Sequence, residues 1–229
     1  MKSVKYLAGI FGQEKLYFEM WWKYKCPFTL KTNWNDENTA FFIHIPKTAG
    51  TSLYTSLGME KLSYTHIPAR VLESFYPDEF ENYFKFAVVR NPWDRFVSLY
   101  EFLKTGTHWP EQKIWAEKII GNKTFEEFVR KINDDYWFRN AVMSDNFFFP
   151  QSYFVTDRKG RVKVDKIYKF EQLSSAFEDL NNRFSTKQTL SHQRKTSARK
   201  KYQDYYTEET KGIIASIYQS DVELFGYKY

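Results

Sequence analysis

The apolar positions of the chain fall into short runs that end abruptly at polar or proline residues. The run at residues 39–45 stops at Pro46, and the run at residues 83–89 leads into Arg90, Asn91 and Pro92. Their length and their content of β-branched and aromatic residues favour buried strands over helices. Residues 162–170 alternate apolar and polar side chains, which predicts a third strand.

Between these runs the apolar spacing changes to a helical period. A proline at the first helical position suits residues 93–103, which follow Pro92. Thr124 followed by Glu127 is a capping-box pattern within the periodic stretch 111–133. The remaining predicted helices begin near residue 53 or cover residues 69–82 (interrupted at Pro77), 171–184 and 207–225, where Gly226 supplies a C-cap.

The segments between these helices and strands are predicted to be irregular. Residues 147–150 read as a turn into a partly extended stretch, residues 157–160 as a turn, and residues 187–201 as a basic loop. Strands that alternate with helices indicate an α/β fold with a mainly parallel sheet. We expect residues 1–38 to form an N-terminal arm and residues 39–229 to form one domain.

Composition narrows the classes of protein that remain. The chain has 229 residues and a formal net charge of +6, a basic excess that suits an anionic ligand but does not point to nucleic acid. Its one cysteine excludes an internal disulfide and a cysteine zinc site, and its four histidines show no metal-ligand spacing. Neither a membrane-spanning run nor a signal-peptide core is visible, which predicts a cytoplasmic protein.

The segment Pro46–Ser52 has the chemistry of a phosphate-binding loop. It follows a predicted strand and precedes a predicted helix, and it contains Lys47, Gly50 and the hydroxyls of Thr51 and Ser52. Small residues let backbone N–H groups approach an anion, and the start of a helix offers further donors. The lysine precedes the glycine, whereas a Walker A loop has the opposite order. An ordinary strand-to-helix turn is the alternative interpretation.

The second strand leads into a second candidate anion site. Arg90 lies at the carboxyl end of that strand, where open α/β sheets bind ligands, and its guanidinium can grip a phosphate with two hydrogen bonds. Ser98 follows about two helical turns later, so the two residues meet only if strand and helix fold around one ligand group. The alternative is that Arg90 and Asp94 form a local ion pair.

Together the two segments, His44–Ser52 and Val89–Tyr100, resemble the nucleotide-binding signatures of carbohydrate sulfotransferases. They are most similar to the group that holds heparan sulfate 2-O-sulfotransferase and its bacterial relatives. Further similarity lies in residues 164–173, 193–197, 205–209 and 223–227, so the resemblance covers roughly residues 40–227. It implies a P-loop-like three-layer sandwich, with a central mainly parallel sheet flanked by helices.

The resemblance also implies a reaction and a set of roles. The donor would be 3′-phosphoadenosine-5′-phosphosulfate (PAPS), the acceptor a hydroxyl of a carbohydrate, and no metal would take part. The donor-binding residues would be Lys47, Thr48, Ala49, Gly50, Thr51, Ser52, Arg90, Ser98, Arg194, Lys195, Thr196 and Ser197. Lys47 would also neutralise the charge that develops on the bridging oxygen as the sulfuryl group leaves.

The resemblance places the catalytic base just after the first helix, where related enzymes carry a histidine and the heparan sulfate enzyme carries a His-x-His arrangement. Here the matching segment begins with Tyr64, and only the second histidine is present, as His66. Imidazole, with an unperturbed pKa near ~6.5, suits the removal of a hydroxyl proton. His66 is therefore the predicted base, and we expect His44 to be buried and hydrogen-bonded.

Two other classes of protein stay open on the sequence alone. A P-loop kinase requires a lysine after the glycine, an aspartate at a second strand end and Mg²⁺, whereas this chain has Lys47 before Gly50 and Arg90 at that strand end. A non-catalytic basic module that binds anions or glycans would use the many aromatic residues, 20% of the chain.

Overall fold

The computed structural model describes residues 40–57, 66–105, 110–185 and 200–229, without the side chains of residues 110 and 111. Its centre is a parallel sheet of strands β1 (Ala40–Ile43), β2 (Phe84–Val89) and β3 (Lys166–Lys169), with β2 in the middle. Ala40 pairs with Phe84, and Phe86 pairs with Lys166. The fold is therefore mixed α/β with a parallel sheet, as the pattern of strands and helices predicts.

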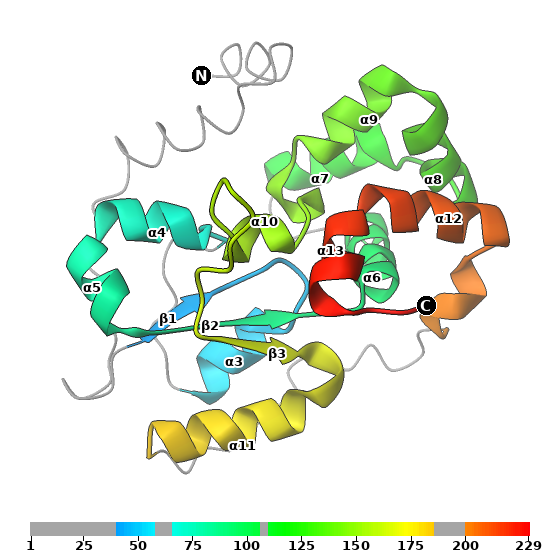
Figure 1. Ribbon diagram of the computed structural model, residues 1–229. Helices are drawn as coiled ribbons and strands as arrows, with labels where there is room; N and C mark the ends of the chain where they lie inside the picture. The colour runs from blue at the N-terminus through cyan, green and yellow to red at the C-terminus, as the bar shows by residue number, and fades with distance from the viewer. Residues whose placement is uncertain (1–39, 58–65, 106–109, 186–199) are drawn as a thin grey trace.

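The strands have the apolar character of a sheet that is covered on both faces. Phe41, Ile43, Ala87 and Val89 pack toward helices α4 (Ala69–Phe75), α5 (Pro77–Asn82), α10 (Ser152–Val155) and α13 (Gln219–Phe225). The alternate positions pack on the opposite face, toward α3 (Gly50–Ser56) and α11 (Leu173–Arg183). Figure 1 shows these two helical layers on either side of the sheet.

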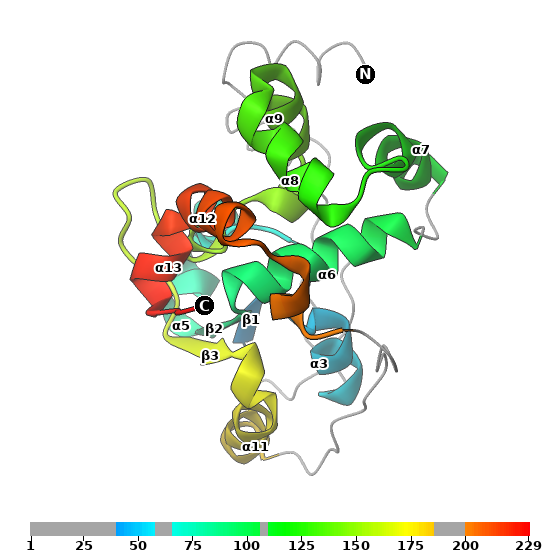
Figure 2. The ribbon, with the colours of Figure 1, turned by 90° about the vertical axis from the view of Figure 1, so that its right-hand side faces the viewer.

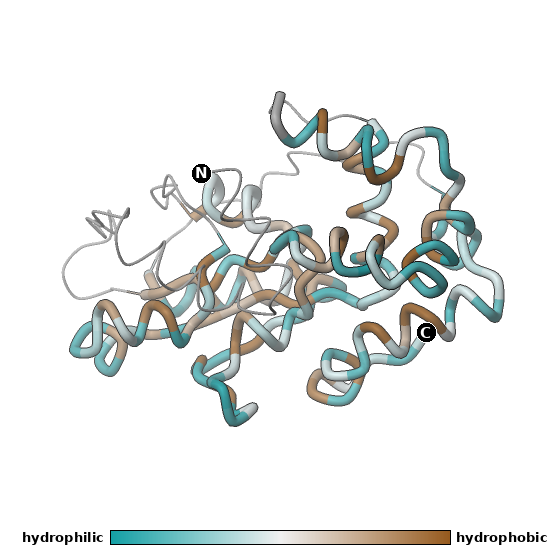
Figure 3. Tube along the Cα trace, turned by 90° about the horizontal axis from the view of Figure 1, so that it is seen from above, coloured by the Kyte–Doolittle hydropathy of each residue, from teal (hydrophilic) through white to brown (hydrophobic). Residues whose placement is uncertain are grey.

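A second core lies beside the sheet and is made by helices alone. It joins α6 (Pro92–Lys104), α7 (Pro110–Ile119), α8 (Phe125–Asp134), α9 (Tyr136–Met143) and α12 (Glu208–Ile217). Short 3₁₀ helices occupy Asn146–Phe148, Phe170–Gln172 and Tyr202–Tyr205. Figure 2 shows α7, α8 and α9 grouped away from the strands, and Figure 3 shows polar positions on the outer turns of the helices.

The local signals at helix ends are confirmed. Thr124 and Glu127 form the predicted capping box at the start of α8, and Pro92 is the first residue of α6. Gly226 follows α13 in the left-handed conformation, with φ of 63°, which glycine adopts without steric cost. Pro77 begins α5, so the predicted interruption of residues 69–82 is also present.

Three predicted segments differ from the structure, two of them because of a long-range contact. Residues 152–155 form helix α10 rather than an extended stretch, because the Asp221 carboxylate accepts the N–H groups of Gln151 and Ser152. Residues 162–170 pair in the sheet only from Lys166, since Val162 instead bridges Thr156. The predicted helix over residues 207–225 is divided at Tyr218, whose buried hydroxyl donates to the carbonyl of Phe148.

Candidate functional site

The candidate site lies where the three parallel strands end. The loop after β1 carries Lys47, β2 is followed directly by Arg90, and β3 is followed by Phe170. The Arg90 guanidinium reaches both neighbours, because its Nη1 donates to the Lys47 carbonyl at 3.2 Å and its carbon lies 4.2 Å from the centre of the Phe170 ring. The two segments recognised in the sequence therefore meet at the carboxyl edge of the sheet.

The loop between β1 and α3 has an unusual backbone. Lys47 and Ala49 have positive φ angles of 67° and 68°, while Thr48 between them does not. Non-glycine residues with positive φ are uncommon, and alternation of left- and right-handed residues turns successive N–H groups toward one concavity that suits an anion. The Thr48 hydroxyl donates to the Ile45 carbonyl at 2.9 Å and ties the loop to the strand end. None of the described side chains caps the start of α3.

Gly50 is required by close packing. A Cβ atom added there would lie 1.8 Å from Nε2 of His44, whose ring covers the start of α3. His44 is buried, as predicted, with 8% of its surface exposed. From the sequence, the lack of a side chain at Gly50 was explained by the need for an anion to approach the backbone. In the structure, the His44 ring occupies the space where a side chain at Gly50 would lie.

Replacing Gly50 by Ala should displace the His44 ring and lower the melting temperature by roughly 2–10 °C, since overpacking a close site costs about 1–3 kcal/mol. Gly212 in α12 is the matched control, because a Cβ atom there meets nothing within 4 Å. Gly212→Ala should raise stability by about 0.5–1 kcal/mol, as alanine does in a helix interior. Thermal unfolding followed by circular dichroism measures both, and equal shifts would contradict the packing argument.

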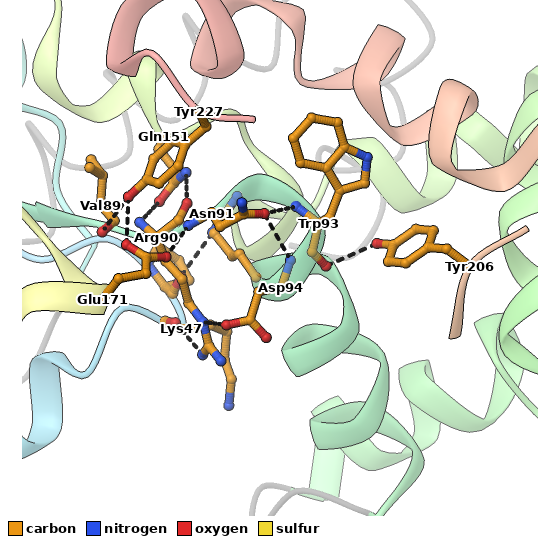
Figure 4. A network of polar contacts seen from close by, with 12 residues as sticks. Lys47, Val89, Arg90, Asn91, Trp93, Asp94, Gln151, Glu171, Tyr206 and Tyr227 are labelled. Carbon is orange, nitrogen blue, oxygen red and sulfur yellow. Dashed lines mark hydrogen bonds and ion pairs between the residues drawn. The ribbon is translucent and has the colours of Figure 1, made fainter. Parts of the chain in front are cut away.

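Arg90 is oriented by side chains from several parts of the chain (Figure 4). Its Nε donates to Asp94 Oδ2 at 2.7 Å, so the local ion pair considered from the sequence does form. The Gln151 amide brackets the backbone of Arg90, accepting its N–H at 2.8 Å and donating to its carbonyl at 2.7 Å. These bonds fix the backbone and the side chain of Arg90 beside Lys47.

Ser98 lies on the same face of α6 as the Arg90 ion pair. It follows Asp94 by one helical turn and precedes Phe102 by another, so all three side chains share one side of the helix. Lys47 reaches this side too, with its Nζ 4.0 Å from the centre of the Phe102 ring. Strand end and helix thus fold around one region, which is the condition for Arg90 and Ser98 to contact one ligand group.

A buried network of polar side chains contacts the loop between β1 and α3. Arg95, with 1% of its surface exposed, donates to the carbonyls of Pro46 at 3.0 Å and Phe147 at 2.8 Å. Burial lowers the pKa of the Arg95 guanidinium, and the nearby charge of Asp221 opposes this shift. Burial also raises the pKa of the Asp221 carboxyl, which the N–H groups of Ser152 and Gln151 counteract. Residues 46 and 90 therefore rest on the same buried scaffold.

His66 contacts the loop through His44. Its Nδ1 lies 3.0 Å from the His44 carbonyl, and the two rings are 4.4 Å apart between centres. Because a carbonyl only accepts, this bond places a proton on Nδ1 and makes Nε2 the unprotonated nitrogen of the neutral ring. His66 has a positive φ of 76°, a conformation that histidine adopts more readily than most residues.

Two aromatic rings connect His66 with Lys47. The Phe147 ring meets the His66 ring edge-on at 5.4 Å and stacks on Phe102 at 6.0 Å. Phe102 in turn lies beneath the Lys47 ammonium. The two residues predicted to be catalytic are thus linked through two aromatic rings, and their catalytic roles stay predictions.

Several residues of the site could not be identified from the sequence. Gln151, Glu171 and Tyr227 bond the segment around Arg90 through side chains, with Glu171 Oε1 accepting the Asn91 N–H at 2.7 Å and Tyr227 bonding both Glu171 and the Val89 carbonyl. Burial, aided by the carboxylates of Asp94 and Glu171, raises the pKa of the Tyr202 phenol. Nothing in the local sequence of these residues signals such contacts.

Some predicted site residues lie outside the part of the chain that the structure describes. They are Arg194, Lys195, Thr196 and Ser197, and Tyr64, which replaces the first histidine of the family arrangement, also lies outside that part. Their roles, and the absence of a metal requirement, stay predictions.

The comparison with protein families agrees with the resemblance carried by residues 44–52 and 89–100. The profile of the sulfotransferase family matches residues 31–228, which include the strand-end loop, Arg90 and the C-terminal helices. The chain belongs to the sulfotransferase family. No curated protein matches the chain. Among the described residues, no helix combines the length and the apolar character needed to cross a membrane.

Proposed function

We propose that this sulfotransferase moves a sulfuryl group from PAPS to a hydroxyl of a carbohydrate acceptor. The observation that carries the proposal is the bond from Arg90 Nη1 to the Lys47 carbonyl at 3.2 Å, which joins the two anion-binding segments at one edge of the sheet. A donor with a phosphate at each end of its nucleoside needs two such sites a short distance apart. A metal-dependent kinase loop has its lysine on the other side of the glycine.

The residues present fit such a donor. The concavity formed by Lys47, Thr48 and Ala49, continued by Gly50, Thr51 and Ser52, is proposed to hold the phosphosulfate end. Arg90 and Ser98 are proposed to hold the 3′-phosphate, since a guanidinium and a hydroxyl both donate to phosphate oxygens. Arg194, Lys195, Thr196 and Ser197 are proposed to complete the nucleotide site, as the family resemblance implies.

His66 and Lys47 are proposed to carry the chemical step. His66 Nε2 takes the proton of the acceptor hydroxyl while that oxygen forms its bond to sulfur. The bond between sulfur and the bridging phosphate oxygen breaks, its electron pair stays on the phosphate, and the Lys47 ammonium neutralises the resulting charge. Adenosine 3′,5′-bisphosphate is the second product. Positioning and charge stabilisation supply the rest of the rate.

Incubation with PAPS labelled in the sulfuryl group, together with a panel of carbohydrates, tests the proposal. We expect label to appear on at least one hydroxyl-bearing sugar, without added Mg²⁺. Label transferred only to water, or only to amines, would contradict the proposed acceptor chemistry.

The proposed role of Arg90 predicts a selective loss of nucleotide affinity. Arg90→Lys keeps the charge but removes the planar donor group and the Nε bond to Asp94. Affinity for adenosine 3′,5′-bisphosphate should fall about 10- to 100-fold, the range expected when hydrogen bonds to a charged group are lost. Adenosine 5′-monophosphate, which lacks the 3′-phosphate, is the matched ligand, and its affinity should stay unchanged. Equal losses for both ligands, measured by calorimetry, would show that Arg90 does not recognise the 3′-phosphate.

A further inference from the structure

The Gln151 side chain takes the place of a neighbouring strand at the end of β2. The pairing of β1 with β2 ends at Ala87 and that of β3 with β2 ends at Val89, so Arg90 is the first residue beyond both pairings. Its backbone N–H is accepted by Gln151 Oε1 at 2.8 Å, and its carbonyl accepts a bond from Gln151 Nε2 at 2.7 Å (Figure 4). A carboxamide carries the same donor and acceptor as a peptide group, so one side chain satisfies both backbone groups.

The two bonds also determine how the amide of Gln151 is oriented. With its oxygen and nitrogen exchanged, the amide would set N–H groups against the N–H of Arg90 and an oxygen against the carbonyl, and neither contact is a hydrogen bond. Gln151 has 0% of its surface exposed, so these groups would be left unsatisfied away from water. The amide therefore has one favourable arrangement, and that arrangement fixes the strand end.

Gln151 is itself held by a buried carboxylate. It is the residue before α10, and its backbone N–H is accepted by Asp221 Oδ2 at 2.8 Å, while Asp221 Oδ1 accepts the N–H of Ser152 at 2.8 Å. The Ser152 hydroxyl in turn lies 2.9 Å from the hydroxyl of Ser220 in α13. The Gln151 amide thus reaches Arg90 from a buried, hydrogen-bonded base.

The backbone of Arg90 sets the direction in which its guanidinium points. A long side chain magnifies any rotation of the backbone, and recognition of a ligand needs its contacts held to within about 0.5 Å. The far end of the side chain bonds Asp94 Oδ2 at 2.7 Å and the Lys47 carbonyl at 3.2 Å. Gln151 fixes one end of the arginine, and these two groups fix the other.

We propose that Gln151 is a positioning residue for recognition of the donor's 3′-phosphate and that it acts only through Arg90. Its amide holds the end of β2 so that the guanidinium lies between the Lys47 loop and α6. Gln151 itself does not touch the donor. This inference rests on the proposed function, because it takes the donor to be a nucleotide whose 3′-phosphate binds Arg90.

The test removes the amide and compares two nucleotides by calorimetry with the full chain. Gln151→Met keeps an unbranched side chain of similar length and removes both bonds to Arg90. Affinity for adenosine 3′,5′-bisphosphate should fall about tenfold, while affinity for adenosine 5′-monophosphate, which lacks the 3′-phosphate, should not change. Gln219→Met is the matched control, since the exposed Gln219 amide bonds Glu223 within α13, and it should leave both affinities unchanged.

A double-variant cycle separates positioning from general support of the fold. If Gln151 acts only through Arg90, Gln151→Met should cause no further loss of bisphosphate affinity in the Arg90→Lys background. Additive losses would show that Gln151 affects the nucleotide by another route and would overturn the inference. Equal losses for the two nucleotides in Gln151→Met, or an unchanged bisphosphate affinity, would overturn it as well.

A second variant makes the test independent of how well Gln151→Met folds. Gln151→Asn keeps a carboxamide but is one methylene shorter, so its amide cannot bond both the N–H and the carbonyl of Arg90. The same selective loss of bisphosphate affinity is expected, smaller than in Gln151→Met. Wild-type affinity for the bisphosphate in Gln151→Asn would contradict the proposed role.

The two proposals fail in distinguishable ways. If the proposed function is wrong, the wild type will bind the bisphosphate no more tightly than the monophosphate and will not transfer label. If only the role of Gln151 is wrong, the wild type will bind the bisphosphate and transfer label, and Gln151→Met will keep the wild-type selectivity between the two nucleotides.

Discussion

Replacing His66 by Asn should reduce the turnover number of sulfuryl transfer about 10²- to 10⁴-fold, the usual contribution of a general base. Asparagine suits this position because it tolerates the positive φ of 76° and its amide can donate to the His44 carbonyl as Nδ1 does. The variant therefore keeps the local structure and loses only the proton acceptor. Steady-state kinetics at saturating donor measure the effect.

Nucleotide binding provides the internal control for this variant. The His66 ring packs against His44 and Phe147, and the proposed phosphate contacts come from Arg90 and Ser98, so the affinity for adenosine 3′,5′-bisphosphate should stay at the wild-type value. A His66→Asn protein with full activity would show that another group removes the proton. A protein that has lost both activity and nucleotide affinity would assign His66 a structural role instead.

Replacing Lys47 by Met should reduce turnover about 10²- to 10³-fold, comparable with the loss of one group that stabilises the developing charge. Methionine preserves the contact of an unbranched side chain with the Phe102 ring, and the backbone cost of positive φ is the same for both residues. What changes is the ammonium charge that is proposed to neutralise the leaving oxygen. Single-turnover kinetics separate this effect from product release.

Lys104 offers a matched control for that variant. Its Nζ also lies over an aromatic ring, 5.3 Å from the centre of Tyr100, but at the exposed C-terminal end of α6. Lys104→Met should leave turnover unchanged. If the two lysine variants lose activity equally, the loss does not come from the position of Lys47 in the loop.

The parts of the fold that depend on neighbouring residues could be predicted from the sequence. The capping box at Thr124, the proline at the start of α6 and the glycine after α13 each act within a few residues of the helix end they define. The strands at residues 40–43 and 84–89 were visible because sheets covered on both faces need continuous apolar runs.

The remainder depends on contacts between distant residues, which local patterns do not contain. Asp221 caps α10 from 69 and 70 positions away, and Gln151 brackets the Arg90 backbone from 61 positions away. In the sequence, nothing distinguishes Arg95 from an exposed arginine of a helix. In the structure it is buried, and its side chain donates to the Pro46 carbonyl of the loop. The same holds for the close packing of His44 on Gly50, which only the folded backbone produces.

The candidate site likewise has features that the local sequence predicts and features that depend on contacts between distant residues. The two segments proposed to bind anions could be recognised from their residue types and order, whereas their convergence at the sheet edge is a property of the parallel topology. The aromatic pair between His66 and Lys47 comes from two separate segments and has no local signature.

One nucleotide with a 3′-phosphate is proposed to bind across the loop at Lys47 and the strand end at Arg90. Calorimetric titration of the wild-type protein with adenosine 3′,5′-bisphosphate, and separately with ATP and Mg²⁺, tests it most directly. The claim predicts tight binding of the bisphosphate without a metal ion and much weaker binding of ATP with Mg²⁺. Tight binding of ATP with Mg²⁺ and none of the bisphosphate would contradict it.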